Sequence, residues 1–406
     1  MTTLTIDRLG RGGDGIAFGP EGPVYVARVL PGEVVEGAVV GGRVDAPRIV
    51  RPSPERVAPP CPHFRRCGGC AVQHLSDDGV AAWRREVVAG ALGRVGIAAE
   101  VTGPDTSPSR SRRRAALSGR KTKGGAVVGF HVRGSDEVVS IPSCQVLDPA
   151  IIAALPALEA VARLAAPRGA EVGLHVTVTA AGLDLAVTEG RPLDRHGLES
   201  LAQTARGFAR VTWNGEPALQ EAPPLVALGP AGVVPPPGAF LQATPEGERA
   251  LVAQVLAALE GVGRVVDLFA GCGTFALPLA RGAAVHAVEA DGPALDALLA
   301  GARGTQGLRA VTAERRDLFR RPLGAAELTA FDAAVIDPPR AGASAQVAEL
   351  ARSALHRIAY VSCNPASFAA DAATLLSAGW RMGPVRVVDQ FRWSPHIELA
   401  AAFERP

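Results

Sequence analysis

The sequence has little excess charge of either sign, few aromatic residues and few cysteines. Lys and Arg number 42 against 40 Asp and Glu, so any affinity for nucleic acid must come from a local basic patch. Aromatic residues make up only 4% of the chain, but 48% of it is hydrophobic, which excludes wholesale disorder. Six cysteines in 406 residues are too few for a disulfide framework, which favours a reducing, cytoplasmic location.

Segments typical of export or membrane insertion are also lacking. The stretch Met1–Gly15 carries four charged residues and has no apolar core of signal-peptide length. The longest uncharged run, Ala222–Pro245, contains seven prolines, which a membrane-spanning helix could not tolerate. We therefore expect no membrane association, and we interpret this run as a Pro-rich connector.

The length predicts two or three domains, and three patterns of predicted secondary structure follow one another along the chain. Residues 1–50 contain short strands separated by glycine, which predicts a small β-barrel. Residues 51–240 predict an α+β domain, with a helix over 77–97 and strands within 115–141 and 171–187. Residues 241–406 alternate strands with helices, which predicts a Rossmann-like α/β domain with a parallel sheet and an antiparallel pair at its end.

A glycine-rich turn, Asp267–Ala276, lies between a predicted strand and a predicted helix, where the backbone can approach a ligand closely. Glu289 ends the next strand, about 20 residues later, where a carboxylate can accept both ribose hydroxyls. Asp317 ends the following strand and could meet an adenine edge. Taken alone, the turn fits a dinucleotide or S-adenosylmethionine, and both acids could simply cap strand ends.

Two further motifs follow strands of the same predicted sheet. Asp337 lies in VIDPPRAG, where two prolines stiffen the loop, and Arg340 stands where adenine-amine methyltransferases have a stacking aromatic residue. Cys363 lies in VSCNP; it could be buried filler, or a nucleophile that attacks carbon 6 of a pyrimidine. Glu398 lies in an apolar closing strand, which fits either a structural carboxylate or a base whose pKa is raised by burial.

Cysteine spacing and charge distribution add two features in the middle of the chain. Cys61, Cys67, Cys70 and Cys144 supply four thiolates, enough for tetrahedral zinc or for a 4Fe-4S cluster. Residues 109–133 contain eight basic residues and no acidic one, which suits phosphate contacts but also fits a solvated loop. The eight are Arg110, Arg112, Arg113, Arg114, Arg120, Lys121, Lys123 and Arg133.

Over nearly its whole length the chain resembles the bacterial RNA uracil carbon-5 methyltransferases, specifically the iron-sulfur members that modify ribosomal RNA. The resemblance rests on CPHFRRCGGC with the later PSC, GAFLQATPE, DLFAGCGTFALPLA, VIDPPRAG, VSCNP and DQFRWSPHIEL, in the order of the family. It also covers residues 1–50, which look like the family's OB-like TRAM barrel. In the last motif Arg392 and Ser394 replace the usual Pro and Thr, which leaves the shape of that loop open.

The resemblance implies a class I methyltransferase fold with S-adenosylmethionine as methyl donor and a 4Fe-4S cluster on the four cysteines. It makes Cys363 the nucleophile and Glu398 the base that removes the proton from carbon 5. It assigns cofactor contacts to Gln242, Phe269, Thr274, Glu289, Asp317 and Asp337.

The expected activity is methylation of carbon 5 of a uridine in RNA by a cytoplasmic monomer. The favoured substrate is 23S ribosomal RNA, and the T-loop of transfer RNA is the alternative. A different class of protein, a non-catalytic RNA-binding or assembly factor on this scaffold, is a second alternative. A nucleotide-dependent oxidoreductase would share the glycine turn but would leave Cys363 and the Asp-Pro-Pro corner unexplained.

Overall fold

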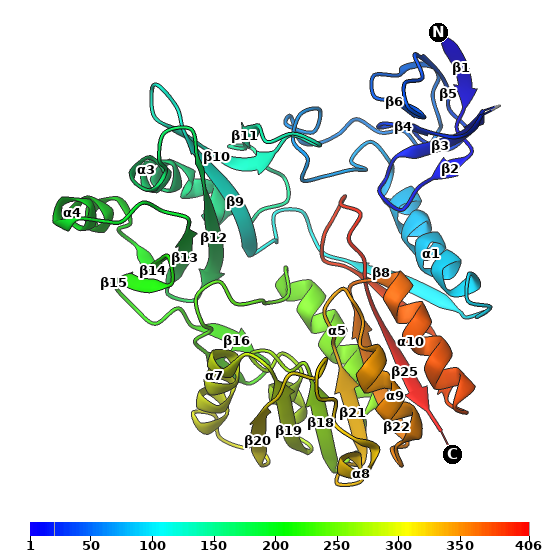
Figure 1. The fold of residues 1–406 in the computed structure, drawn as a ribbon, viewed down its shortest axis with the longest axis vertical. Coiled ribbons are helices and arrows are strands. Elements are labelled where there is room, and N and C mark those ends of the chain that lie inside the picture. Colours follow the sequence, from blue (N-terminus) through cyan, green and yellow to red (C-terminus); the bar gives the residue numbers. More distant parts are fainter. Residues whose placement is uncertain (20, 406) are drawn as a thin grey trace.

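The computed structural model describes residues 1–19 and 21–405, and its amino-terminal part consists of two small sheets around a common core (Figure 1). One sheet has the order β1-β5-β7 and the other β2-β3-β4-β6. Ile6, Val26, Val29 and Val35 lie fully buried between them. The strands are β1 (Thr2–Thr5), β2 (Arg8–Leu9), β3 (Gly15–Gly19), β4 (Gly22–Val26), β5 (Val34–Gly37), β6 (Arg43–Val44) and β7 (Arg48–Arg51).

The middle of the chain forms a seven-stranded mixed sheet, in the order β11-β10-β9-β12-β13-β14-β15, and this sheet with its helices has the expected α+β character. Helix α3 packs on β9 and β10, and α4 packs against α3. The sequence interpretation missed α4, β14 and β15, because α4 has few apolar residues and the fully buried β14 lacks the alternation of a half-buried strand. The elements are β9 (Arg114–Lys121), β10 (Ala126–His131), β11 (Val138–Ser140), α2 (Pro149–Ala153), α3 (Leu155–Ala165), β12 (Glu171–Thr179), β13 (Gly182–Thr188), α4 (Arg195–Thr204), β14 (Phe208–Trp213) and β15 (Glu216–Gln220).

The proline-rich run is more than a connector. It contains a hairpin of β16 (Val226–Leu228) and β17 (Ala231–Val233), and the hairpin packs on α7 (Gly292–Arg303). Buried Leu228 and Val233 share an apolar cluster with Cys272 of the glycine turn. Cys272 therefore packs in an apolar cluster, and the hairpin supports the glycine turn.

The carboxyl-terminal sheet is nine-stranded, with the order β20-β19-β18-β21-β22-β25-β24-β8 and β23 paired to β25. Strands β18 to β22 pair in parallel and β25 is antiparallel to its neighbours, which confirms the predicted α/β arrangement and its closing pair. The strands are β18 (Arg264–Leu268), β19 (Ala284–Glu289), β20 (Val311–Arg315), β21 (Ala333–Ile336), β22 (Arg357–Ser362), β23 (Arg381–Met382), β24 (Val385–Asp389) and β25 (Glu398–Glu404).

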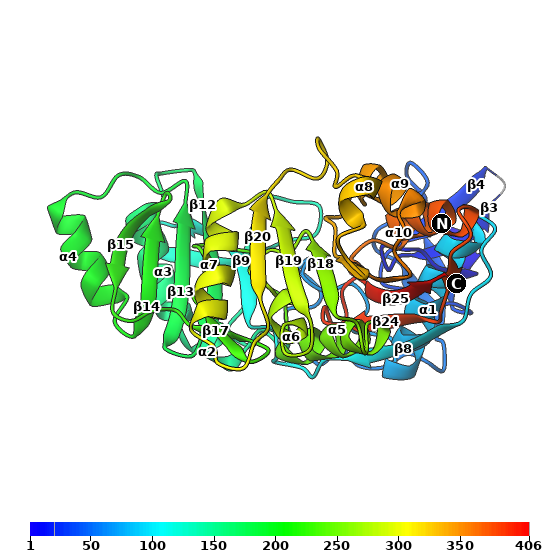
Figure 2. The ribbon, with the colours of Figure 1, turned by 90° about the horizontal axis from the view of Figure 1, so that it is seen from below.

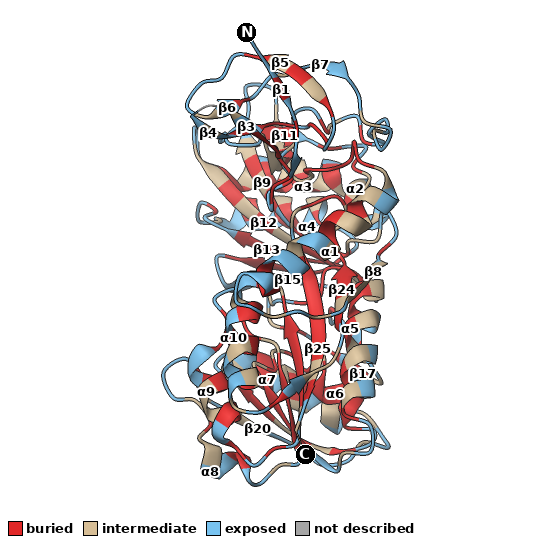
Figure 3. Ribbon diagram, turned by 90° about the vertical axis from the view of Figure 1, so that its right-hand side faces the viewer, coloured by how far each residue is buried: buried red, intermediate tan, exposed pale blue. Residues whose placement is uncertain are grey.

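Helices cover both faces of this sheet, so its central strands β18, β21, β22 and β25 are buried (Figure 3). One apolar core joins the sheet to α1, α8, α9 and α10, and the other joins it to α5, α6 and α7. Capping residues begin several of them: Ser76 for α1, Thr244 for α5 and Asn364 for α10 each accept a backbone N–H. The helices are α1 (Asp77–Gly93), α5 (Pro245–Ala258), α6 (Ala276–Leu279), α8 (Ala325–Leu328), α9 (Ser344–Arg352) and α10 (Pro365–Ser377).

In the view of Figure 2 the central strands β12 to β15 lie on the left, β20, β19 and β18 lie in the middle, and β3 and β4 of the amino-terminal part lie on the right. One early segment of the chain nevertheless belongs to the carboxyl-terminal sheet. Strand β8 (Val101–Thr106) pairs in parallel with β24, and α1 packs on α10. Residues that the sequence assigned to the central domain thus complete the edge of the carboxyl-terminal sheet. In the described part of the chain, each helix is too short or too polar to span a bilayer.

Candidate active site

The predicted site residues that follow β18, β19, β21 and β22 gather at the carboxyl edge of the parallel sheet. The turn after β18 has an unusual backbone: Phe269 has φ 63°, and Gly271 and Gly273 also have positive φ. A side chain at Gly273 would meet Leu298 and Leu277 at 2.8 and 3.0 Å, so the turn requires glycine there. Thr274 follows in the same turn and is half-buried.

The carboxylate of Glu289 stabilises this turn directly. It accepts the backbone N–H of Gly271 at 3.0 Å and those of Ala290 and Asp291 at 2.6 and 3.0 Å. Asp317 lies after β20 and accepts the N–H of Phe319 at 3.0 Å, so it caps its own loop. The ring of Phe319 lies 5.4 Å from that of Phe269 and is half exposed. The carboxylates of Glu289 and Asp317 therefore both accept hydrogen bonds from nearby backbone N–H groups, at the sheet edge where a ligand would lie.

Asp337, Cys363 and Glu398 are coupled through their charges. Burial raises the pKa of the Cys363 thiol to about 12, and the carboxylates of Glu398 and Asp337 add to the shift. Burial and the charge of Asp337 raise the pKa of Glu398 to about 8, and burial raises that of Asp337 to about 7. Three acidic groups in one partly dry site cannot all ionise without a compensating cation.

Arg340 is a functional candidate that the sequence interpretation used only as evidence against another reaction. Its charge opposes the upward pKa shifts of both Cys363 and Glu398. Its carbonyl accepts the side-chain N–H of Asn364 at 2.8 Å, which ties the Asp-Pro-Pro loop to the residue after the nucleophile candidate. The sequence signal for this role was the cationic Arg340, directly after the Asp-Pro-Pro residues.

Gln242 reaches the site from the segment before α5. Its side chain is buried, and its Oε1 accepts the Nε2 of Gln390 at 2.5 Å. Buried Arg113 fixes the same segment, because its Nε donates to the Gln242 carbonyl at 3.2 Å and its guanidinium pairs with Glu248 at 2.5 Å. Thus Arg113, which the sequence assigned to a basic RNA surface, is a structural bridge between two parts of the chain.

The other basic residues of the segment 109–133 also divide by environment. Arg112 and Arg114 are half-buried, and Arg133 forms a bidentate ion pair with Asp14. Arg110, Lys121 and Lys123 are exposed, and no ion pair to them is found in the part of the chain that the structure describes. The continuous stripe in the sequence therefore leaves only some of its cations available for phosphate.

The amino-terminal sheets contribute a residue to the site that sequence reasoning missed. Arg11, in the turn between β2 and β3, donates from Nη2 to Oδ1 of Asn364 at 2.6 Å. Gly10, next to it, accepts the indole N–H of Trp83 at 3.3 Å. Residues 353 positions apart thus meet beside Cys363, a long-range contact that local sequence patterns cannot reveal.

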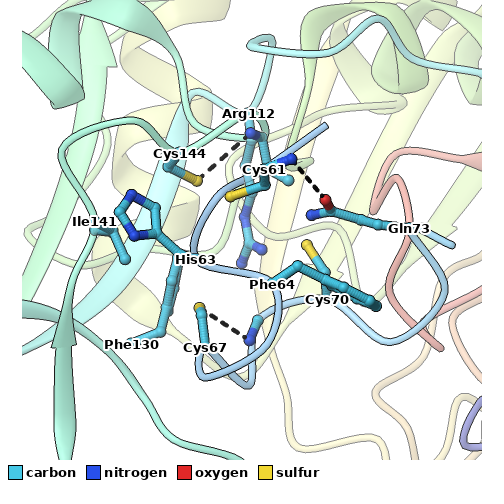
Figure 4. A pocket seen from close by; sticks show the side chains of 12 residues that line it. Cys61, His63, Phe64, Cys67, Cys70, Gln73, Arg112, Phe130, Ile141 and Cys144 are labelled. Atoms are coloured by element: carbon cyan, nitrogen blue, oxygen red, sulfur yellow. Dashed lines mark hydrogen bonds between the residues drawn. The ribbon is translucent and has the colours of Figure 1, made fainter. Parts of the chain in front are cut away.

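The four predicted ligand cysteines line one pocket. Cys61, Cys67, Cys70 and Cys144 surround it together with Arg112 and Phe130 (Figure 4). Burial raises the pKa of the Cys70 thiol to about 12, and the other three sulfurs contribute to the shift. Within residues 1–19 and 21–405, however, no three His, Cys, Asp or Glu side chains stand close enough to hold a metal ion.

The loop before Glu398 is attached to this cysteine segment and to α1. The carbonyl of Trp393 accepts the backbone N–H groups of Ala71 and Val72 at 2.8 and 3.1 Å. Fully buried Arg84 donates to the carbonyls of Phe391, Ser394 and His396 and pairs with Asp389 at 2.8 Å. Glu398 is therefore positioned by residues from the whole length of the chain.

Comparison with known proteins agrees with this fold. The sequence pattern of the tRNA (uracil-5-)-methyltransferase family matches residues 237–405. An RNA methyltransferase of Caulobacter vibrioides is 46% identical over 100% of both chains. The 23S rRNA (uracil(1939)-C(5))-methyltransferase RlmD of Pseudomonas entomophila is 36% identical over 99% of this chain and 93% of its own length.

A solved structure shares the fold as well. The Pyrococcus abyssi tRNA (uracil-54, C5)-methyltransferase, in complex with S-adenosyl-L-homocysteine, matches with a TM-score of 0.74 and 22% identity, over 99% of this chain and 100% of that one. The fold is thus that of a Rossmann-like methyltransferase. The chain belongs to the RNA uracil-5-methyltransferase family.

Proposed function

We propose that this enzyme methylates carbon 5 of a uridine in 23S ribosomal RNA through a transient covalent bond between Cys363 and carbon 6. The observation that best supports the proposal is the pairing of Ser362 with Leu399 between β22 and β25, which brings Cys363 and the buried carboxyl of Glu398 side by side at one sheet edge. A nucleophile and a base that act on adjacent carbons of one ring must lie close to each other.

The reaction needs both groups because carbon 5 of uracil is a poor nucleophile. When the Cys363 thiolate adds to carbon 6, a carbon–sulfur bond forms and the ring becomes an enolate. Carbon 5 then displaces the methyl group from a sulfonium, which leaves as a neutral thioether. Glu398 takes the remaining proton from carbon 5, the carbon–sulfur bond breaks, and the thiolate leaves as the ring double bond is restored.

The methyl donor that we propose is S-adenosylmethionine, held by Gln242, Phe269, Glu289 and Asp337, with Thr274 and Asp317 nearby. Its positive sulfonium would offset the negative charges of Asp337 and Glu398, which raise the pKa of Cys363 when no ligand is bound. Donor binding would thus favour the thiolate. The cation of Arg340 acts in the same direction and can stabilise the enolate oxygen.

For the RNA, likeness over 93% of the length of an RlmD enzyme supports ribosomal RNA. The half-buried position of Cys363 requires a uridine that leaves its stack, in a loop or after flipping. We propose that the amino-terminal sheets act as a TRAM-type RNA-binding barrel and that Arg110, Lys121 and Lys123 contact phosphates. We also propose that the enzyme works as a cytoplasmic monomer.

We propose that Cys61, Cys67, Cys70 and Cys144 hold a 4Fe-4S cluster. The four thiols line one pocket and supply the number of thiolate ligands that such a cluster takes. The resemblance to the iron-sulfur members of the family favours the cluster over zinc. The guanidinium of Arg112 in the pocket would offset part of the negative charge of the thiolates.

Three proteins test the catalytic assignment with labelled methyl donor and ribosomal RNA. We expect that Cys363→Ala abolishes methylation, because no adduct can form. Glu398→Gln should accumulate a protein–RNA adduct that survives a denaturing gel, because its proton-transfer step is blocked. Cys272→Ala is the matched control at a thiol outside the proposed chemistry and should stay active. Full turnover by Cys363→Ala would refute the mechanism. Methylation of transfer RNA alone would overturn the assignment of ribosomal RNA as the substrate.

A further inference from the structure

Gln390 connects the proposed cofactor side of the site with the proposed base. It follows β24 directly, its side chain is 1% exposed, and it lies between the Gln242–Ala243 backbone and Glu398. It lies in the motif DQFRWSPHIEL, which by itself assigns it no role. A buried amide needs partners for both its oxygen and its nitrogen, so its orientation is informative.

The orientation follows from one backbone group. The N–H of Ala243 points at Oε1 of Gln390 at 2.7 Å, and a backbone N–H can only donate. Hence Nε2 of Gln390 faces Gln242, and since an amide NH₂ can only donate, Gln242 presents its Oε1, at 2.5 Å. The Nε2 of Gln242 is thereby turned away from Gln390 and is available for a bound acceptor.

Gln390 also lies next to Glu398, because Val388, two residues before Gln390, pairs with Glu398 across β24 and β25, and the Gln390 amide acts as a donor that lowers the pKa of Glu398. The two hydrogens of one NH₂ group can therefore serve Gln242 and Glu398 together. We propose that Gln390 is a positioning residue for methyl transfer, which fixes the amide of Gln242 and the carboxylate of Glu398 relative to each other. This inference rests on the proposed function, because it gives Glu398 the role of base.

The charged groups around Glu398 determine how loss of the Gln390 donor would change the pKa of Glu398. Asp337 and Cys363 face Glu398 with negative charge when ionised, and Arg340 faces it with positive charge. The bond from Gln390 lowers the pKa of Glu398, because it favours the ionised carboxylate. Without the donor, Glu398 should hold its proton to higher pH and should be less well oriented toward carbon 5.

The test compares Gln390→Met with Gln346→Met. Gln346, in α9, is also 1% exposed, and its amide also bonds to backbone, at the N–H and carbonyl of Leu323. The measurement is single-turnover decay of the protein–RNA adduct across pH. For Gln390→Met we expect decay to slow about tenfold, the effect of losing a hydrogen bond to a charged group, and its pH midpoint to rise.

Binding of S-adenosylhomocysteine by calorimetry gives a second readout, and we expect it to weaken several-fold in Gln390→Met. Gln346→Met should lose thermal stability to a similar extent with unchanged decay and pH midpoint. If Gln390→Met does not fold, Gln390→Asn replaces it, since the shorter amide cannot reach both partners and should show the same shift. Decay with the wild-type rate and pH midpoint, or an equal shift in Gln346→Met, would overturn the inference while the function stands. If even Glu398→Gln forms no adduct, the proposed function fails and this inference falls with it.

Discussion

The carbonyl oxygen of Trp393 accepts the backbone N–H of Ala71, the residue after Cys70, at 2.8 Å. One hydrogen bond thus joins the cysteine segment to the loop that leads into Glu398. The neighbouring N–H of Val72 bonds to the same carbonyl. The conformation of the cysteine segment and that of the loop before Glu398 therefore depend on each other.

Removal of the proposed cluster from the purified protein should loosen both segments. We expect faster amide hydrogen exchange at Ala71 and Val72 and in residues 391–397, because their shared carbonyl contact weakens when the four thiols lose their common ligand. Peptides from α7, which packs on the opposite side of the sheet, are the internal control. Unchanged exchange in residues 391–397 after complete loss of iron would show that the two segments are independent.

Replacing Arg84 by Met should lower the free energy of unfolding by about 3 kcal/mol, because Asp389 would remain buried without its partner. Three carbonyls of the loop 391–396 would lose their donor as well. Urea denaturation measures the change. Arg195→Met, which removes an exposed pair with Glu199, is the control and should change stability by less than about 1 kcal/mol. Equal effects of the two substitutions would contradict a structural role for the Arg84 contacts.

The resolving step should depend on pH through Glu398. Its pKa is raised to about 8, and a base acts only when ionised, so adduct decay should slow as pH falls below 8. Well below the pKa, the ionised fraction falls about tenfold per pH unit. Adduct lifetimes measured at a series of pH values on both sides of the pKa check this expectation. A lifetime that is constant over this range would mean that another group removes the proton.

RNA affinity should depend on the exposed cations of the basic segment. Substitution of Arg110, Lys121 and Lys123 by Ala should reduce the slope of log affinity against log salt by about 3, because each cation that no longer neutralises a phosphate changes the slope by roughly one. Arg281, Arg303 and Arg309 are equally exposed but lie at the opposite edge of the sheet, so their triple substitution is the charge-matched control. Equal slopes for the two triple variants would exclude the segment from the RNA interface.

Much of the architecture could be predicted because it follows local rules. Alternating strands and helices after residue 241 define the parallel sheet, and the order of the strands brings Gly271, Asp337 and Cys363 to one edge. The four cysteines were grouped correctly from their spacing, and they line one pocket. These patterns reflect periodicity and turn chemistry over short stretches of sequence.

What could not be predicted depends on long-range packing. Strand β8 joins the sheet only because β24 offers a free edge. Arg113 and Arg133 look like surface cations, but Glu248 and Asp14 neutralise them from elsewhere in the chain. Gln390 has no distinctive sequence signal, since its importance arises from three partners that folding assembles.

The contact between Arg11 and Asn364 has a consequence for how this protein could be divided or recombined. The first turn of the chain lies beside Asn364, which caps α10 and directly follows Cys363. An exchange of the amino-terminal region with that of a distant relative would therefore alter the surroundings of Cys363 as well as the proposed RNA-binding surface. A chimera of this kind should keep its fold and lose turnover until a side chain of matching reach is restored at position 11.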